Sequence, residues 1–209
     1  MITNDIARAA VALTALQNVS KEIKQTSDLP ATPVAPADAN IIKQLKEKNI
    51  LVLPVSLSSN YVAVNFINDT IVDNNDLQLI KQLSKQLVSL KLSGTNITDD
   101  GLKTVAQCNN LIKLFLDATP VTDNGLKNLI PLSNLRYLNL VNTRVTAKGI
   151  SQLKTLSKLR SVYLYKTLIT KQDWPVLQQS FPHTKLDSGG YIVPTLATDT
   201  TTVKAKTAY

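Results

Sequence analysis

The stretch that decides the fold runs from residue 87 to residue 183. It reads LVSLKLSGTNITDDGLKTVAQCNN (87–110), LIKLFLDATPVTDNGLKNLIPLSN (111–134), LRYLNLVNTRVTAKGISQLKTLSK (135–158) and LRSVYLYKTLITKQDWPVLQQSFPH (159–183). The first three copies are each 24 residues long and open with L-x-x-L-x-L. A fixed period of about 20–29 residues with this opening is typical of an α/β solenoid, in which every copy adds one parallel strand and one short helix.

Each copy divides into a strand, a turn and a helix. Leu90 and Leu92 alternate with Lys91, which is the two-residue period of a strand buried on one face. Threonine recurs at the following turn, where a short polar side chain can bond backbone groups that face the stack. An aliphatic residue two positions later forms a second inward row. The turn residues are Thr95, Thr119, Thr143 and Thr167, and the second row is Ile97, Val121, Val145 and Ile169.

The helix of each copy has its own signals. A threonine follows each second-row residue at a favoured N-cap position. Asp99 and Asp123 fall in the first helical turn, where the helix dipole favours negative charge. Glycine recurs inside that turn, which indicates a crowded contact between copies and not a phosphate-binding loop. The N-cap residues are Thr98, Thr122, Thr146 and Thr170, and the glycines are Gly101, Gly125 and Gly149.

Two segments lie at the start of the chain. Residues 1–25 predict an amphipathic helix; a signal peptide is the weaker alternative, because Asp5 stands where a basic cluster is expected. Residues 26–37 contain three prolines and predict a semi-rigid, largely extended linker.

The solenoid ends also need caps, because terminal repeats must cover the open stack. Residues 38–60 predict an N-terminal cap: a helix begun by Asp38, with Ile42 and Leu45 inward, and then an edge strand containing Pro54. The repeats span 61–183, of which 61–86 is a degenerate first copy with Tyr61, Val64 and Phe66 at leucine positions and Ile71 in the second row. In the fourth regular copy Trp174 and Pro175 are expected to interrupt the helix. Residues 184–196 are expected to fold back as a C-terminal cap, and 197–209 to be disordered.

Composition gives no sign of catalysis. The net charge is +8, but the lysines are scattered over helix positions, which favours a solvated convex side over a nucleic-acid surface. No apolar run approaches the length needed to span a bilayer. The single cysteine, Cys108, is expected to be a buried thiol, and the single histidine, His183, a surface residue and not a metal ligand. No catalytic residue and no metal site is predicted.

The outward-facing strand residues form the candidate site. In solenoids of this kind the exposed, concave side of the sheet can bind partners, and four aromatic residues fall there. Neighbouring strands lie about 4.8 Å apart, so Phe115 and Tyr163 should be roughly 10 Å apart, with Tyr137 diagonal to both. The alternative is that the aromatics stack on one another or lie under the C-terminal segment. The predicted partner-binding residues are Lys91, Lys113, Phe115, Asp117, Tyr137, Asn139, Tyr163 and Tyr165.

The repeat core T-x-I/V-T-D-x-G-L, at 95–102 and 119–126, resembles the cysteine-containing, ribonuclease-inhibitor-like class of leucine-rich repeats in bacteria. Three stretches beyond this core, PADANIIKQLKEKNILVLPVSLSSNY (36–61), LVNTRVTAKGISQL (140–153) with VYLYKTLITKQDWPVLQQ (162–179), and LDSGGYIVPTL (186–196), resemble a single family. Its members are bacterial envelope proteins with a membrane-spanning module, a c-type cytochrome domain and then a leucine-rich repeat domain. The resemblance implies that this chain is the C-terminal repeat domain, displayed on the periplasmic side because c-type haem is attached there.

The chain departs from that family in one respect. It has no C-x-x-C-H motif, so no cofactor is expected here, and haem is expected only in an upstream cytochrome domain. Either the chain is a truncated product, with 1–25 as a remnant of the junction, or it works apart from the cytochrome. Three non-enzymatic functions follow: a monomeric protein-interaction module of the cell envelope, a structural spacer with no ligand of its own, or an envelope polyanion binder. Neither nucleic-acid binding nor membrane insertion is expected.

Overall fold

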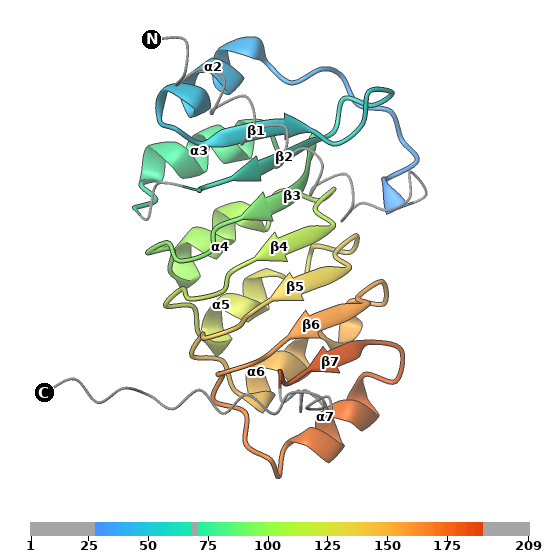
Figure 1. Cartoon of the computed structure of the whole chain (residues 1–209). Coiled ribbons are helices and arrows are strands. Elements are labelled where there is room, and N and C mark those ends of the chain that lie inside the picture. Colours follow the sequence, from blue (N-terminus) through green and yellow to red (C-terminus); the bar gives the residue numbers. More distant parts are fainter. Residues whose placement is uncertain (1–27, 68–70, 190–209) are drawn as a thin grey trace, which may run out of the picture.

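The computed structural model describes residues 28–67 and 71–189. The predicted helix at 1–25, the predicted tail at 197–209 and residues 190–196 of the predicted C-terminal cap lie outside them. In the described part, seven strands form one sheet in the order β1-β2-β3-β4-β5-β6-β7 (Figure 1). Strands β2 to β7 are parallel to one another, and β1 pairs antiparallel with β2.

The strands alternate with short helices that stack along the other side of the sheet (Figure 1). The predicted α/β solenoid is therefore confirmed. Its strands are β1 (Leu51–Pro54), β2 (Val62–Asn65), β3 (Leu87–Lys91), β4 (Lys113–Phe115), β5 (Tyr137–Asn139), β6 (Ser161–Tyr163) and β7 (Lys185–Asp187). Its helices are α2 (Ala39–Glu47), α3 (Asn74–Gln82), α4 (Asp99–Val105), α5 (Asp123–Asn128), α6 (Ala147–Ser151), the 3-10 helix η2 (Gln152–Thr155) and α7 (Trp174–Ser180).

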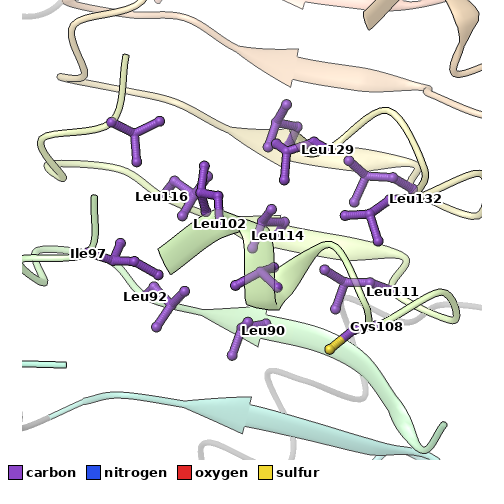
Figure 2. Packing of buried hydrophobic residues seen from close by; sticks show 14 of the residues in the cluster. Leu90, Leu92, Ile97, Leu102, Cys108, Leu111, Leu114, Leu116, Leu129 and Leu132 are labelled. Carbon is purple, nitrogen blue, oxygen red and sulfur yellow. The ribbon is translucent and has the colours of Figure 1, made fainter. Parts of the chain in front are cut away.

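The core consists of leucine rows that run along the stack. The last leucine of each strand motif has almost no exposed surface, and these four residues lie in successive parallel strands or directly after them. Figure 2 shows how leucines from two neighbouring copies interleave with residues of the helix between them. Each row joins every copy to the next, so no copy has a core of its own. The four residues are Leu92, Leu116, Leu140 and Leu164.

The turn threonines act as the sequence predicts. Each hydroxyl donates a hydrogen bond to the carbonyl oxygen of the leucine three residues earlier, at 2.7, 2.6, 2.6 and 2.8 Å along the chain. A polar side chain is tolerated at this inward position because its hydroxyl is hydrogen-bonded to the backbone. The four donors are Thr95, Thr119, Thr143 and Thr167.

The first copy differs from its prediction at two rows. Val62, not Tyr61, pairs with the leucine position of the next strand, because the register shifts by one residue between Val62 and Ala63. Ile71 is 66% exposed, and its neighbour Val72 packs against the core in its place. The sequence spacing cannot decide between Ile71 and Val72 for the second inward row, because this copy is 26 residues long and not 24.

The N-terminal cap matches its expected shape, with one correction on its helix. Asp38 caps α2 by accepting a hydrogen bond from the Asn40 N–H, and Pro54 lies on the edge strand β1. The fully inward pair is Ile41 with Leu45, four residues apart, whereas Ile42 is only partly buried. Leu45 is therefore inward as predicted, and Ile41 takes the fully buried position that was assigned to Ile42.

Two corrections concern the C-terminal end. Pro175 does not interrupt a helix; it lies in the first turn of α7, where its missing N–H has no helical partner to lose. Residues 185–187 do not fold back. They form β7, which continues the sheet in parallel beside β6, because α7 returns the chain to the same starting edge as the earlier helices (Figure 1).

Candidate functional site

The concave face is the side of the sheet that points away from helices α3 to α7. Its central row follows the strand register from Lys91 to Phe115, Asn139, Tyr163 and Asp187. Phe115 and Tyr163 are therefore two strands apart, with Asn139 between them, as predicted. Lys91 at the N-terminal end of this row is exposed.

Aromatic exposure is concentrated on the last strands. Tyr163 is 38% exposed and Tyr165 is 45% exposed, whereas Phe115 and Tyr137 are half-buried. The ammonium of Lys166 lies 5.4 Å from the centre of the Tyr165 ring. Gly189, just after β7, approaches the same ring so closely that an added Cβ would lie 2.7 Å from it. Tyr163 thus remains the most accessible aromatic of the central row.

The strand alternation predicted Lys113 as an exposed residue of the concave face, and this prediction is wrong. Lys113 is only 7% exposed, because its ammonium lies 5.2 Å from the Tyr137 ring centre and an N-terminal segment covers its strand. Asp28 and Leu29 of that segment, together with Lys113, line a cavity of only about 10 Å³. The period-2 pattern gave the correct face of the sheet but could not reveal what lies over it.

Asp117 and Asn139, two other predicted ligands, bind each other. Asp117 Oδ1 accepts hydrogen bonds from Ser93 Oγ at 2.7 Å and from Asn139 Nδ2 at 2.9 Å. Asn139 Oδ1 accepts from the Val141 N–H at 3.1 Å. Much of the hydrogen-bonding capacity of these two side chains is therefore used within the sheet, and a partner would find fixed polar groups and not free ones.

The covering segment is the main feature that the sequence reasoning missed. We call residues 28–36 the strap; its Pro-rich composition predicted a linker. Its carbonyl oxygens accept hydrogen bonds from Tyr61 Oη to Thr32 (2.6 Å), Asn60 Nδ2 to Val34 (2.8 Å) and Gln86 Nε2 to Ala35 (3.0 Å). Leu29 and Val34 pack against a separate buried cluster of Tyr61, Val88 and Ile112. Burial there raises the pKa of Tyr61.

The strap ends on a pair of arginines. Asp28 Oδ1 accepts hydrogen bonds from Arg136 and, at 3.0 Å, from Arg160. A hydrogen bond with Tyr137 raises the pKa of Arg160, and the charge of Asp28 adds to the effect. Tyr137 therefore links the strap to the aromatic side of the concave face. The sequence offered one signal for this contact: arginine occurs directly after the first leucine in both the third and the fourth regular copies.

No group of three or more His, Cys, Asp or Glu side chains is placed to hold a metal ion in 28–67 and 71–189. His183 is exposed. Burial raises the pKa of the Cys108 thiol to about 12, so it is a packing residue in the core and not a nucleophile.

A comparison with protein families matches part of the repeat region. A family model described as leucine-rich repeat matches residues 84–106, which contain β3, its turn threonine and the whole of α4. The fold is a leucine-rich repeat solenoid. Such solenoids present an extended concave surface for binding and are typical protein-interaction scaffolds. A search of curated proteins finds no match.

Several solved structures resemble the solenoid. An internalin from Listeria monocytogenes is 26% identical over 55% of this chain and 32% of its own, with a TM-score of 0.44. A leucine-rich repeat protein from Leptospira interrogans is 28% identical over 52% of this chain and 27% of its own, with a TM-score of 0.41. The ectodomain of a receptor kinase from Arabidopsis thaliana is 15% identical over 75% and 93%, with a TM-score of 0.43. The chain thus spans a third or less of the two bacterial structures.

In the described part of the chain, no helix has both the length and the apolar character that crossing a membrane requires.

Proposed function

We propose that the chain is a non-catalytic protein-interaction module that binds a protein partner through the C-terminal half of its concave face. The observation that carries this proposal is the exposure of Tyr163, 38%, on the central row of β6. Large exposed aromatics on a rigid sheet are frequent anchors of interfaces, because they bury much area at little cost in conformational entropy.

Fixed polar groups surround this anchor. Asn139 lies between Phe115 and Tyr163 in the register, and its bond to Asp117 holds it in one orientation. A preorganised surface loses little freedom on binding, which raises affinity for a partner of matching shape. Lys91 would lie at the far end of the same row, and Lys113 contributes only indirectly, by supporting the Tyr137 ring.

The family resemblance supports a more specific proposal. In it, the module is the periplasmic C-terminal domain of a membrane-associated c-type cytochrome protein, and its partner belongs to the same envelope assembly. The chain itself holds no haem-attachment motif, so haem would be bound only by an upstream cytochrome domain. Reading the DNA directly upstream tests this: a C-x-x-C-H motif in frame is expected, and an unrelated upstream gene would contradict it.

A photo-crosslinking experiment tests the binding face. A benzophenone amino acid replaces Tyr163 on the concave face or, as the matched control, the exposed Lys127 on helix α5 of the convex side. Illumination in cells of the source organism should give a discrete adduct from position 163 and none from 127. Adducts from both positions, or from neither, would remove the proposal.

A structural spacer is the second candidate, and the internal bonding of Asp117 favours it. If the concave face only stabilises the sheet, then Tyr163→Ala combined with Tyr165→Ala should leave every association of the chain unchanged. These two tyrosines are the suitable pair, because replacing Tyr137 would also disturb Lys113 and Arg160. The readout is co-purification of the partner that the crosslinking identifies: its loss in this double variant, with an unchanged melting temperature, would favour the interaction module over the spacer.

A further inference from the structure

Four residues, each directly after the first leucine of a regular copy, form a row along the side of the solenoid where the strands begin. They are Val88, Ile112, Arg136 and Arg160. Backbone hydrogen bonds of 2.8 Å join them in order, from the Ile112 N–H to Val88, from the Arg136 N–H to Ile112, and from the Arg160 N–H to Arg136. The row thus changes from apolar to cationic along the solenoid. We call these four residues the edge row.

The strap covers the edge row with matching chemistry. Leu29 packs beside Val88 and Ile112, and Asp28 lies on Arg136 and Arg160. An acidic residue followed by an apolar one therefore fits the junction between the two halves of the row. We propose that the edge row is a docking site for an extended, carboxylate-bearing peptide segment of a partner protein, and that the strap occupies this site in the free chain.

The charge at the site exceeds what the strap neutralises. One carboxylate, that of Asp28, faces two guanidinium groups, and both donate to the same oxygen. Beside them, a cavity of about 330 Å³ is lined by strap residues 28–32, Arg136, Lys158 and two asparagines. Lys158 donates to Asn134 and not to a carboxylate. Three cations around one carboxylate leave a positive site, with open space next to it, for a further anionic group.

The strap is held in a way that permits exchange. Apart from the bonds to the Asp28 carboxylate, its described hydrogen bonds run from the side chains of Asn60, Tyr61 and Gln86 to strap carbonyl oxygens, so any extended peptide could accept them. Residues 31–33, 35 and 36 of the strap are exposed. Recognition that uses backbone carbonyls, one apolar contact and one carboxylate is how grooves commonly bind extended segments. This site uses the edge row and not Tyr163 or Tyr165, and it adjoins the concave face at Tyr137, which bonds Arg160.

A competition experiment with the full chain tests the proposal. The probe is a fluorescein-labelled peptide with the strap sequence, TSDLPATPVAPA (26–37). Wild-type chain should bind it weakly, because the resident strap has a high effective concentration. The variant with both Asp28→Asn and Leu29→Ser, called the weakened-strap chain, should bind it at least about tenfold more tightly, since one lost charge-assisted bond corresponds to about a tenfold change. The affinity should fall as salt is added.

Three controls complete the test. A peptide with asparagine in place of its aspartate should bind the weakened-strap chain about tenfold more weakly than the original peptide does. Adding Arg160→Gln to the weakened-strap chain should weaken binding of the original peptide by a similar factor. Asp100→Asn, which removes an exposed acid on α4, should leave peptide binding at the wild-type level. Equal binding of the aspartate and asparagine peptides, or no binding by the weakened-strap chain, would overturn the proposal. A doubling of mass in light scattering would also overturn it, because the site would then take the strap of a second copy.

Discussion

The carboxylate of Asp99 binds Thr122, which lies one copy further along the chain, at two points. It accepts the Thr122 N–H at 2.8 Å on one oxygen and the Thr122 hydroxyl at 2.6 Å on the other. Asp123 binds Thr146 in the same way, also at 2.8 and 2.6 Å. The aspartates in the first helical turn therefore join consecutive copies, a role beyond the helix-dipole effect that their position predicts.

The ends of the solenoid replace this bond between copies with a local one. Ala147 stands where the third copy would need its aspartate, and Thr170 is bound within its own copy, by Asp173. In the first copy Asp73 and Asp76 form a capping box. Both Asp76 and Asp173 occupy the position of the repeat glycine. Asp76 and Asp173 thus bond backbone N–H groups of their own copy, whereas Asp99 and Asp123 bond the threonine of the next copy.

Asp123→Ala should lower the free energy of unfolding by about 2 kcal/mol. Two hydrogen bonds to a charged acceptor are lost, and the partly buried Thr146 N–H is left without its partner. Urea denaturation measures the change. Asp100→Ala is the matched control, because Asp100 is exposed and pairs with Lys103 on its own helix; it should leave the urea midpoint nearly unchanged. Equal effects of the two substitutions would contradict the bond between copies.

Gly149→Ala should destabilise by about 1–3 kcal/mol, the usual cost of overpacking. An added Cβ would lie within 2.5 Å of Asp123 Cγ, so the aspartate would have to leave its position. The substitution should therefore be strongly coupled to Asp123→Ala: the double variant should lose less stability than the sum of the two single ones. Additive effects in a denaturant-based double-mutant cycle would show that glycine is not there to make room for the carboxylate.

Ala118→Gly should stabilise the chain by about 1 kcal/mol. Ala118 has a φ of 55°, a left-handed conformation that costs a non-glycine residue about 1–2 kcal/mol, and the first regular copy has Gly94 at the same position with a φ of 70°. Part of the gain is offset by the greater flexibility of glycine in the unfolded chain. The reciprocal Gly94→Ala serves as the control and should lower the melting temperature, although no atom lies within 4 Å of its added Cβ.

The sequence predicted those features that repeat every 24 residues. The leucine rows and the turn threonines recur in register, so each copy confirms the assignment of the others. Thr98, Thr122 and Thr146 are N-cap residues as predicted, but Thr170 is not, because α7 begins only after Asp173. The contact between the aspartate of one copy and the threonine and glycine of the next was not predicted. The sequence does contain a signal for it, because T-D-x-G recurs in the first two regular copies. The terminal copies were harder to predict, because a register shift at Val62 or a proline at the start of α7 occurs only once.

The candidate site was predictable only as far as the strand pattern reaches. Alternation placed Tyr163 and Lys113 on the same face, and register confirms that arrangement. The burial of Lys113 depends on a strap whose Asp28 meets Arg136 across 108 residues of sequence. No local periodicity reports such a contact, and a Pro-rich composition argues for a linker whether or not the segment finds a groove.

Cys108 should be unreactive in the folded chain. Burial raises its thiol pKa from 9.0 to about 12, so almost no thiolate exists at pH 8, and Ellman's reagent should react only as fast as the chain opens. The sign of the pH dependence follows: the unfolded thiol ionises above about pH 9 and the folded one does not, so stability should fall between pH 9 and 12. Cys108→Ala should reduce that fall. Rapid labelling of native protein at one equivalent of reagent would contradict the buried position.

Lys48→Met should be the most damaging of the charge-removing substitutions. Lys48 caps the end of α2 and reaches Asp76 at 2.6 Å and Asp73 at 3.3 Å, which joins the N-terminal cap to the first copy. The Asp76 side chain is only 2% exposed, so losing its partner leaves a buried charge, at a cost of about 3–5 kcal/mol. The hydrogen bond to Asp76 raises the pKa of Lys48, so this contribution is fully present below pH 10.5 and is lost as the pH rises through the folded value.

Lys43→Met is the control, because Lys43 pairs with Glu47 at 3.8 Å and both side chains are more than 60% exposed; it should cost less than about 0.5 kcal/mol. If the two methionine variants unfold at the same urea concentration, the cap is not held to the solenoid by this ion pair.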